Sequence, residues 1–399
     1  MTTHFRWAIS IFAVLLVMSA AAIAQPTTGT VKTLTLKSAV LGEERTVLVR
    51  TPVGYETNNV RYPVLYMTDG DAHMGHTAGT IDFLNHHGRM SELIVVGVPN
   101  TDRTRDLTPT KSTNKNAAGE LQFPTSGGAD NFLKFFETEL IPLIEKQYRV
   151  EPYRVLAGHS LGGLFAIHSM ISKPRLFNSY VAVSPSLQWE NGETFKRAEN
   201  FLMNQKELKA TLYVSLGNET GPIKERFESF KELLSKTSIK DFEWQAERME
   251  DEDHGTVVLR SHYAGLRKVY AGWQPARDPN GTWSGGLKGA EEHYKKLSEK
   301  YGYSIPVPEN LINQIGYQLL NANKPEEAIA VFKTNVERYP NSANVYDSLA
   351  EAYERSGRLD LAEPLYDKAR VLGQQNNDPN TSLYKANYER VHAKLKEKK

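Results

Sequence analysis

The segment YRVLAGHSLGGLFAIH, residues 153–168, decides the fold of this 399-residue chain. It begins with an apolar run that is typical of a buried strand, turns through Gly158, Ser160 and Gly162, and continues with apolar residues at helical spacing. A serine between a strand and a helix sits on a strained turn, so its neighbours must be small. The segment therefore predicts a nucleophile elbow that exposes Ser160 at the end of a strand. The alternative is an ordinary glycine-rich turn whose serine caps the helix.

Further apolar runs on both sides of this segment indicate strands, and stretches with helical spacing separate them. The expected strands cover residues 30–36, 44–51, 62–68, 91–98, 179–183, 210–216 and 241–248. This alternation predicts the α/β class, with a doubly wound, mainly parallel sheet that carries helices on both faces. The predicted domain spans residues 25–275. One polar stretch inside it, residues 99–128, is expected to be a long irregular loop.

A serine hydroxyl is a weak nucleophile and needs a base to take its proton. Five histidines follow Ser160 in the chain. His254 stands in a loop after the last expected strand, where sheets of this kind place their sites, and is the predicted base. His168 lies about two turns along the helix that begins at the elbow, so it is expected to be a core residue.

The base in turn needs an acid that orients it, and in doubly wound hydrolases the chain order is serine, acid, histidine. Glu219 directly follows the expected strand 210–216 and is the predicted acid. Glu225, one turn into the next helix, is the second candidate. A Ser–His dyad oriented by a carbonyl or by water is also compatible with the sequence.

Stabilising the oxyanion of a tetrahedral intermediate requires two backbone donors. The amide of Leu161 follows the nucleophile and is the first candidate. The second donor comes from the loop after an earlier strand. The run 62–68 ends at such a loop, so the amide of Gly70 or Asp71 is predicted to supply it; a simple turn is the alternative.

The composition excludes several classes of partner. The net charge is +1 and charged residues make up 24% of the chain, so nothing indicates nucleic-acid binding. There is no cysteine, which rules out disulfides and a thiol nucleophile. Residues 1–24 combine a weakly basic start, an apolar run over 7–18 and the sequence Ala-Ile-Ala at 22–24. This pattern predicts a signal peptide cleaved after Ala24, export to the periplasm or beyond, and no membrane span afterwards; an uncleaved anchor is the alternative.

The C-terminal third of the chain shows a different pattern. Residues 276–306 are expected to be a linker followed by a helix. Over residues 307–375, large and small residues recur at an offset of 34 residues, which is typical of tetratricopeptide repeats and predicts a small all-α domain. Residues 376–399 are expected to form a C-terminal helical tail. Such repeats suggest a protein partner or self-association.

Several short segments together resemble one known family. They are residues 65–70 (Leu-Tyr-Met-Thr-Asp-Gly), 96–100 (Val-Gly-Val-Pro-Asn), 103–109 (Arg-Thr-Arg-Asp-Leu-Thr-Pro), 157–163, 184–186 with Trp189, and His254 with Gly255. They resemble the putative-esterase branch of the α/β-hydrolases, which includes esterase D-like proteins and siderophore esterases of the enterobactin type. The resemblance covers about residues 30–275. It implies hydrolysis of carboxylic esters, with a small-molecule ester as substrate and no metal or organic cofactor.

The same resemblance implies that Arg103, Arg105 and Trp189 lie near the site and bind substrate, with the arginines holding an anionic group. In the structural alternative, Arg105 pairs with Asp106 and fixes the long loop. The histidines of residues 73–87 do not have metal-ligand spacing and are expected to lie in a loop near the cleft. Three functions remain open. The first is a serine esterase, with siderophore lactones as one specific substrate class. The second is a different acyl chemistry at the same site, either acyl transfer or peptide hydrolysis. The third is a non-catalytic scaffold that uses the repeats.

Overall fold

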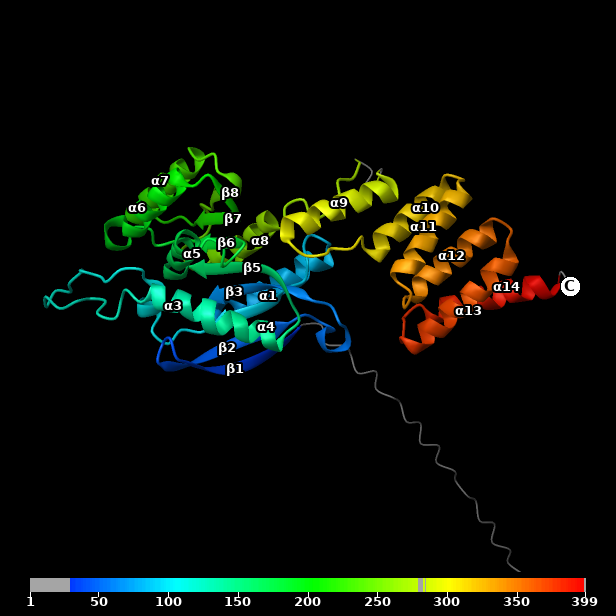
Figure 1. The fold of residues 1–399 in the computed structure, drawn as a ribbon, viewed down its shortest axis with the longest axis horizontal. Coiled ribbons are helices and arrows are strands. Elements are labelled where there is room, and N and C mark those ends of the chain that lie inside the picture. Colours follow the sequence, from blue (N-terminus) through cyan, green and yellow to red (C-terminus); the bar gives the residue numbers. More distant parts are fainter. Residues whose placement is uncertain (1–28, 279–282, 284, 398–399) are drawn as a thin grey trace, which may run out of the picture.

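The computed structural model describes residues 29–278, 283 and 285–397 (Figure 1). The predicted signal peptide, residues 1–24, lies outside the described residues. The strands are β1 (Thr30–Ser38), β2 (Glu43–Thr51), β3 (Tyr62–Thr68), β4 (Ile94–Val98), β5 (Val150–His159), β6 (Ser179–Val183), β7 (Glu207–Leu216) and β8 (Lys240–Arg248). The helices among and after them are η1 (Tyr55–Thr57), α1 (Gly70–His86), α2 (Arg103–Leu107), α3 (Ala129–Phe135), η2 (Phe136–Leu140), α4 (Ile141–Gln147), α5 (Leu161–Ser172), α6 (Trp189–Asn204), α7 (Pro222–Ser235) and α8 (Val257–Val269).

All eight strands form a single sheet in the order β1-β2-β4-β3-β5-β6-β7-β8. Strands β3 to β8 run parallel to one another, and the hairpin of β1 and β2 joins this group in antiparallel direction through β4. The predicted fold class, a doubly wound and mainly parallel α/β sheet, is confirmed. In such a sheet the carboxyl ends of the parallel strands meet at one edge, and this edge carries the predicted site.

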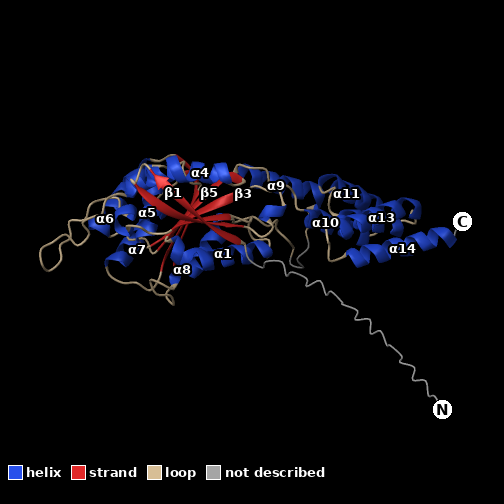
Figure 2. Ribbon diagram, turned by 90° about the horizontal axis from the view of Figure 1, so that it is seen from below, coloured by secondary structure: helices blue, strands red, loops and turns tan. Residues whose placement is uncertain are grey.

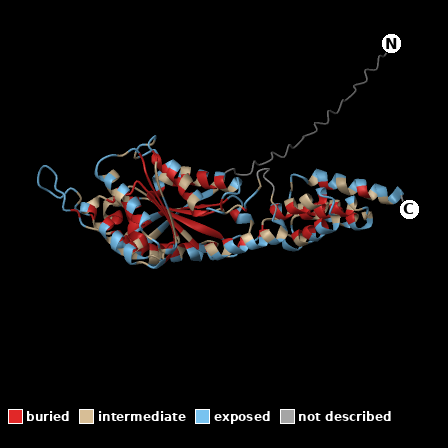
Figure 3. Ribbon diagram, turned by 90° about the horizontal axis from the view of Figure 1, so that it is seen from above, coloured by how far each residue is buried: buried red, intermediate tan, exposed pale blue. Residues whose placement is uncertain are grey.

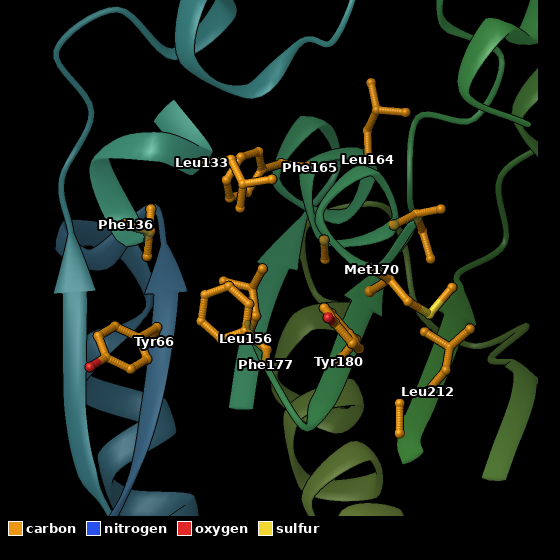
Figure 4. Packing of buried hydrophobic residues seen from close by; sticks show 14 of the residues in the cluster. Tyr66, Leu133, Phe136, Leu156, Leu164, Phe165, Met170, Phe177, Tyr180 and Leu212 are labelled. Carbon is orange, nitrogen blue, oxygen red and sulfur yellow. The ribbon is translucent and has the colours of Figure 1, made fainter. Parts of the chain in front are cut away.

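The strands bury both of their faces because alternate side chains point to opposite sides. Tyr66, Leu156 and Tyr180 belong to the cluster that α3 to α7 cover, whereas their neighbours Leu65 and Val155 face α1, α8 and the helix that follows the body. Figure 2 shows the sheet between α4 and α5 on one side and α1 and α8 on the other, and Figure 4 shows the first cluster in detail. In Figure 3 the strands are buried while the helices expose their outer faces.

The helical tail consists of α9 (Gly286–Tyr301), α10 (Glu309–Asn321), α11 (Pro325–Arg338), α12 (Ala343–Arg355), α13 (Leu359–Gln375) and α14 (Thr381–Glu397). Helices α10 and α11, and likewise α12 and α13, pack as hairpins beside the body (Figure 1). At Gly316 a Cβ atom would lie 2.4 Å from the ring of Phe332, so glycine lets α10 and α11 approach closely without displacing that ring. The tetratricopeptide assignment stays a prediction.

Helix α9 joins the tail to the underside of the sheet through an aromatic layer. The Tyr301 ring is stacked on Tyr270, with centroids 5.3 Å apart, and meets the edge of Tyr153 from β5 at 4.9 Å. The Tyr301 hydroxyl donates to the Val269 carbonyl at 3.0 Å. All three tyrosines are buried, and the same apolar cluster continues into α10.

Two local expectations were wrong. The segment that holds His73 and His76 is helical, because α1 begins at Gly70 and runs unbroken to His86. Glycine is required at position 70, since a Cβ there would lie 2.5 Å from the backbone of Gly97 in β4. The long polar stretch is not wholly irregular either, because it contains α2, which Asp102 caps by accepting from the Arg105 amide at 2.9 Å.

Candidate active site

The chain turns sharply at Ser160, between β5 and α5. Its φ of 59° and ψ of −113° are unusual for a residue with a side chain, and holding it there costs about 1–3 kcal/mol. A Cβ at Gly158 would lie 2.3 Å from the Gly162 carbonyl oxygen, so strand and helix approach each other too closely for any other residue. The Ser160 amide donates to the Val183 carbonyl at 2.9 Å and ties the turn to the end of β6. This is the geometry of a nucleophile elbow.

The predicted base and acid meet at the same edge of the sheet. His254 lies in the loop between β8 and α8, and Glu219 lies three residues beyond the end of β7. His254 Nδ1 is 2.7 Å from Glu219 Oε1. The two loops are joined by a hydrogen bond from the Asn218 amide to the Glu252 carbonyl at 2.7 Å. The pairing occupies Nδ1 and leaves Nε2 of His254 as the nitrogen that could accept a proton.

The electrostatics of the pair suit an orienting role for the acid. Burial alone would raise the pKa of Glu219, but the hydrogen bond with His254 and the nearby Ser184 hydroxyl outweigh it and hold the pKa below its usual value. The carboxylate is therefore ionised at neutral pH and accepts a proton-bearing Nδ1. The Glu219 side chain is 11% exposed, whereas that of His254 is 44% exposed. Glu225, the second candidate for the acid, lies within α7.

The predicted oxyanion donors lie at the starts of two helices. Leu161 is the first residue of α5, and Gly70 and Asp71 are the first two residues of α1. Amides in the first turn of a helix have no acceptor within the helix, so these donors are available to an oxyanion. The strands that lead to the two helices, β3 and β5, are direct parallel neighbours. The two helix starts therefore lie side by side.

Arg103 and Arg105 are both held by carboxylates of the protein. Arg103 Nε donates to Asp69 Oδ1 at 2.6 Å, and its other arm reaches the His159 carbonyl at 3.0 Å, so it braces the two turns that carry the site. Arg105 pairs with Asp106 at 2.7 Å and with Glu43 at 2.6 Å. The structural alternative thus describes Arg105 better than the prediction that it holds an anionic substrate.

Trp189 connects the long loop to the site. Its indole Nε1 donates to the Thr110 carbonyl at 3.2 Å, and its ring lies 5.3 Å from that of Phe123 between centroids. Its backbone amide donates to Ser186 at 3.0 Å. The neighbouring Glu190 accepts from the Ser112 hydroxyl at 2.7 Å. Trp189 therefore ties the long loop to the segment that carries Ser186.

Two residues near Ser160 had no assigned role in the sequence analysis. Ser186 Oγ lies 3.4 Å from Ser160 Oγ. Ser186 follows the end of a strand at the same edge of the sheet, and this position in the sequence could have indicated that it lies near Ser160. The ring of His159 lies 4.6 Å from that of His254. Burial, with the nearby rings of His254 and His73, lowers the pKa of His159 to about 4, so it stays neutral. No sequence pattern predicts the contact between His159 and His254.

Other histidines extend from this point into the body. The rings of His73 and His76 on α1 lie 6.0 Å and 5.5 Å from that of His262 on α8, whose Nδ1 is 2.8 Å from the Thr77 hydroxyl. Over residues 29–278 and 285–397, no three ligand-type side chains are arranged to hold a metal ion. Within the same residues, no helix is both long enough and apolar enough to span a membrane.

Comparison with known proteins places this architecture. The sequence family described as Putative esterase matches residues 38–275. The chain is 30% identical to the siderophore enterobactin esterase of Emericella nidulans in a match over 237 residues that covers 49% of this chain and 77% of that protein. It is also 30% identical to the ferri-bacillibactin esterase BesA of Bacillus subtilis over 154 residues, 35% of this chain and only 53% of BesA.

A solved structure agrees with these matches. The IroE-like serine hydrolase of Shewanella oneidensis superimposes with a TM-score of 0.67 at 26% identity and covers 78% of this chain and all of that protein. The family match extends over more than half of the sequence and includes Ser160, Glu219 and His254. The chain therefore belongs to the putative esterase family, the carboxylic ester hydrolases with the α/β-hydrolase fold.

Proposed function

We propose that the protein is an exported serine esterase that cleaves carboxylic esters through an acyl-enzyme, with Ser160, His254 and Glu219 as its triad. The observation that carries this proposal is the 2.7 Å contact between His254 and the largely buried Glu219, at the strand edge where Ser160 occupies a strained turn. Each of these features is what nucleophilic catalysis by serine requires, and their chain order is that of α/β-hydrolases.

In the first half of the reaction, Ser160 Oγ attacks the ester carbonyl carbon while its proton passes to His254 Nε2. The oxyanion that forms accepts hydrogen bonds from the amide of Leu161 and from that of Gly70 or Asp71. The intermediate collapses, the C–O bond of the alcohol breaks, and the alkoxide leaves with the proton from His254. The acyl group remains on Ser160.

In the second half, water replaces the alcohol. His254 takes a proton from water, the hydroxide adds to the acyl carbon, and the bond to Ser160 Oγ breaks as the proton returns to it. The products are a carboxylic acid and the free enzyme. Glu219 keeps the imidazole oriented and stabilises its protonated form in both halves.

The substrate class that we propose for the first tests is a siderophore ester. The support is the names of two relatives, which act on enterobactin and on ferri-bacillibactin. Arg103 and Arg105 are engaged by protein carboxylates, so recognition would rest on other contacts, with Trp189 and the loop before it as candidates. We propose export on the pattern of residues 1–24 and a protein partner or self-association for the helical tail.

The decisive experiment compares the wild-type enzyme with Ser160→Ala. The variant should fold normally but lose hydrolysis of p-nitrophenyl acetate and labelling by a fluorophosphonate probe. A screen over short acyl esters, feruloyl esters and ferric siderophores would then rank substrates, and added acceptor alcohols would separate hydrolysis from acyl transfer. Full activity of Ser160→Ala would refute the proposal.

A further inference from the structure

Ser184 is a buried serine that the mechanism above does not use. It directly follows β6 and is fully buried, yet its φ of 39° places it in the left-handed region. Its amide donates to the Ser215 carbonyl at 2.8 Å and so fixes it against β7, the strand that leads to Glu219. Because a left-handed serine is unfavourable, the fold holds this side chain in a direction that an ordinary strand end would not give it.

Two buried oxygen atoms beside this position lack a hydrogen-bond partner of regular geometry. One is Ser184 Oγ and the other is Glu219 Oε2, the carboxylate oxygen that does not face His254. Their needs are complementary, since a hydroxyl can donate and a carboxylate can only accept. The hydroxyl also lies close enough to Glu219 to help keep the pKa of that carboxyl low.

The space around Glu219 Oε2 is closed on another side by Gly217. A Cβ atom at this position would lie 2.7 Å from Oε2 and equally close to the Glu252 carbonyl oxygen. The Glu219 carboxylate is therefore turned away from solvent. It lies between Ser184, which follows β6, and Gly217, which follows β7.

We propose that Ser184 is a positioning residue of the active site: its hydroxyl donates to Glu219 Oε2 and thereby holds Oε1 against His254 Nδ1. A carboxylate anchored through one oxygen cannot rotate away when the imidazole becomes protonated. This inference rests on the proposed function, because it assigns a supporting residue to the same triad.

The test uses two variants that lack the hydroxyl but differ in backbone preference. Ser184→Ala keeps the strain of a positive φ, whereas Ser184→Gly relieves it. Both should lower kcat for p-nitrophenyl acetate roughly 10- to 100-fold with little change in KM, because a misaligned acid weakens the transition state and not substrate binding. The acid-side half-maximum of the pH profile should move to lower pH, since the carboxylate then supports a protonated imidazole less well.

A matched control is available at the opposite end of the same strand. Ser179 is also fully buried on β6, and its Oγ lies 2.5 Å from the Tyr153 hydroxyl. Ser179→Ala also removes one buried hydroxyl, but it should leave kcat within about twofold of wild type. Thermal unfolding of all variants separates loss of folding from loss of catalysis, and the glycine variant carries the test if the alanine variant does not fold.

Two results would overturn the inference. Wild-type kcat in Ser184→Gly alone would show that position 184 matters for its backbone conformation only. Wild-type kcat and an unchanged pH profile in both variants would show that Ser184 has no role. These failures differ from failure of the proposed function, which would appear as full activity of Ser160→Ala whatever the Ser184 variants do.

Discussion

Two histidines that follow Ser160 in the chain each pair with a carboxylate at nearly the same distance. His254 Nδ1 lies 2.7 Å from Glu219, and His168 Nε2 lies 2.8 Å from Asp130. Their burial is reversed. The His254 side chain is 44% exposed and its acid 11%, whereas His168 is fully buried and its acid is 78% exposed. The two contacts are thus alike in length but opposite in burial, and under the proposed function only the pair with the exposed ring is catalytic.

The nitrogen that each histidine uses follows the same division. His254 contacts its carboxylate through Nδ1, which leaves Nε2 for the proposed proton transfer. His168 gives Nε2 to Asp130, and its Nδ1 faces Ser172 and Arg197, each at 3.4 Å. A buried imidazole whose two nitrogens both have partners stabilises the packing of its surroundings. An exposed imidazole that is paired with a largely buried carboxylate has one nitrogen free to transfer a proton.

The largest difference should appear when each ring is removed. His254→Ala is expected to lower kcat/KM by about 10⁴-fold or more with little loss of stability, because the ring is half-exposed. His168→Ala should instead cost about 2–4 kcal/mol of unfolding free energy and leave the activity of the folded fraction within about threefold. Ester hydrolysis and urea unfolding of both variants measure this. A folded but inactive His168→Ala would contradict the comparison.

Removing the charge from each acid should give the next largest contrast. Glu219→Gln is expected to reduce kcat by roughly 10³- to 10⁴-fold, since the amide no longer orients and stabilises the imidazolium. Asp130→Asn should change activity less than about twofold and stability less than about 0.5 kcal/mol, because its carboxylate is in solvent. Steady-state kinetics with matched thermal unfolding decide the point. An equal loss of kcat in Glu219→Gln and Asp130→Asn would show that the two carboxylates do not differ in function.

The buried ring should also make stability depend on pH. Burial lowers the pKa of His168 below 6.5, although Asp130 opposes this, and Arg197 adds to it. The unfolded chain therefore takes up a proton first as the pH falls below about 6.5, and the contribution of this site, full above that pH, is lost toward the lower folded pKa. We compare the unfolding free energy of wild type and His168→Gln by urea titration between pH 7 and pH 5. The slope of this free energy against pH should be shallower in His168→Gln, and the difference should correspond to at most about one proton bound by the unfolded chain. An identical slope would contradict this assignment.

The smallest effect concerns coupling within each pair. The double variant Glu219→Gln with His254→Ala should be no less active than His254→Ala alone, within about threefold, because an acid that acts through a missing ring has nothing left to orient. The exposed Asp130 should couple to His168 by about 1 kcal/mol or less in a stability cycle. Additive losses of activity for Glu219 and His254 would mean that they act independently.

The fold and the triad candidates could be predicted from the sequence because both follow from local rules. Periodicity of apolar residues gave the strands, and the glycines around Ser160 gave the elbow. Chain order and strand ends then selected His254 and Glu219. These rules need only a few neighbouring residues and the known direction of parallel strands.

The expectations from the sequence are incomplete or wrong where distant contacts decide the outcome. Arg105 pairs with Glu43, 62 residues away, so no motif could show that its charge is occupied. The start of α1 was missed because its buried face includes Thr77 and Thr80, and glycines at 70, 75 and 79 weaken the helical pattern. Close approach to Gly97 favours glycine at position 70, a constraint that only the folded chain reveals.

The aromatic layer beneath the sheet has a consequence for how the protein melts. The rings of Tyr153 and Tyr270 belong to the catalytic body, but Tyr301 from α9 covers them. Loss of the tail would expose these two buried rings to water. The contact with α9 therefore contributes to the stability of the body and couples the unfolding of the two parts. We expect a single calorimetric transition for the full chain, and a lower melting temperature for a chain that stops at residue 275. The catalytic unit, in the thermodynamic sense, extends at least one helix beyond the esterase sequence.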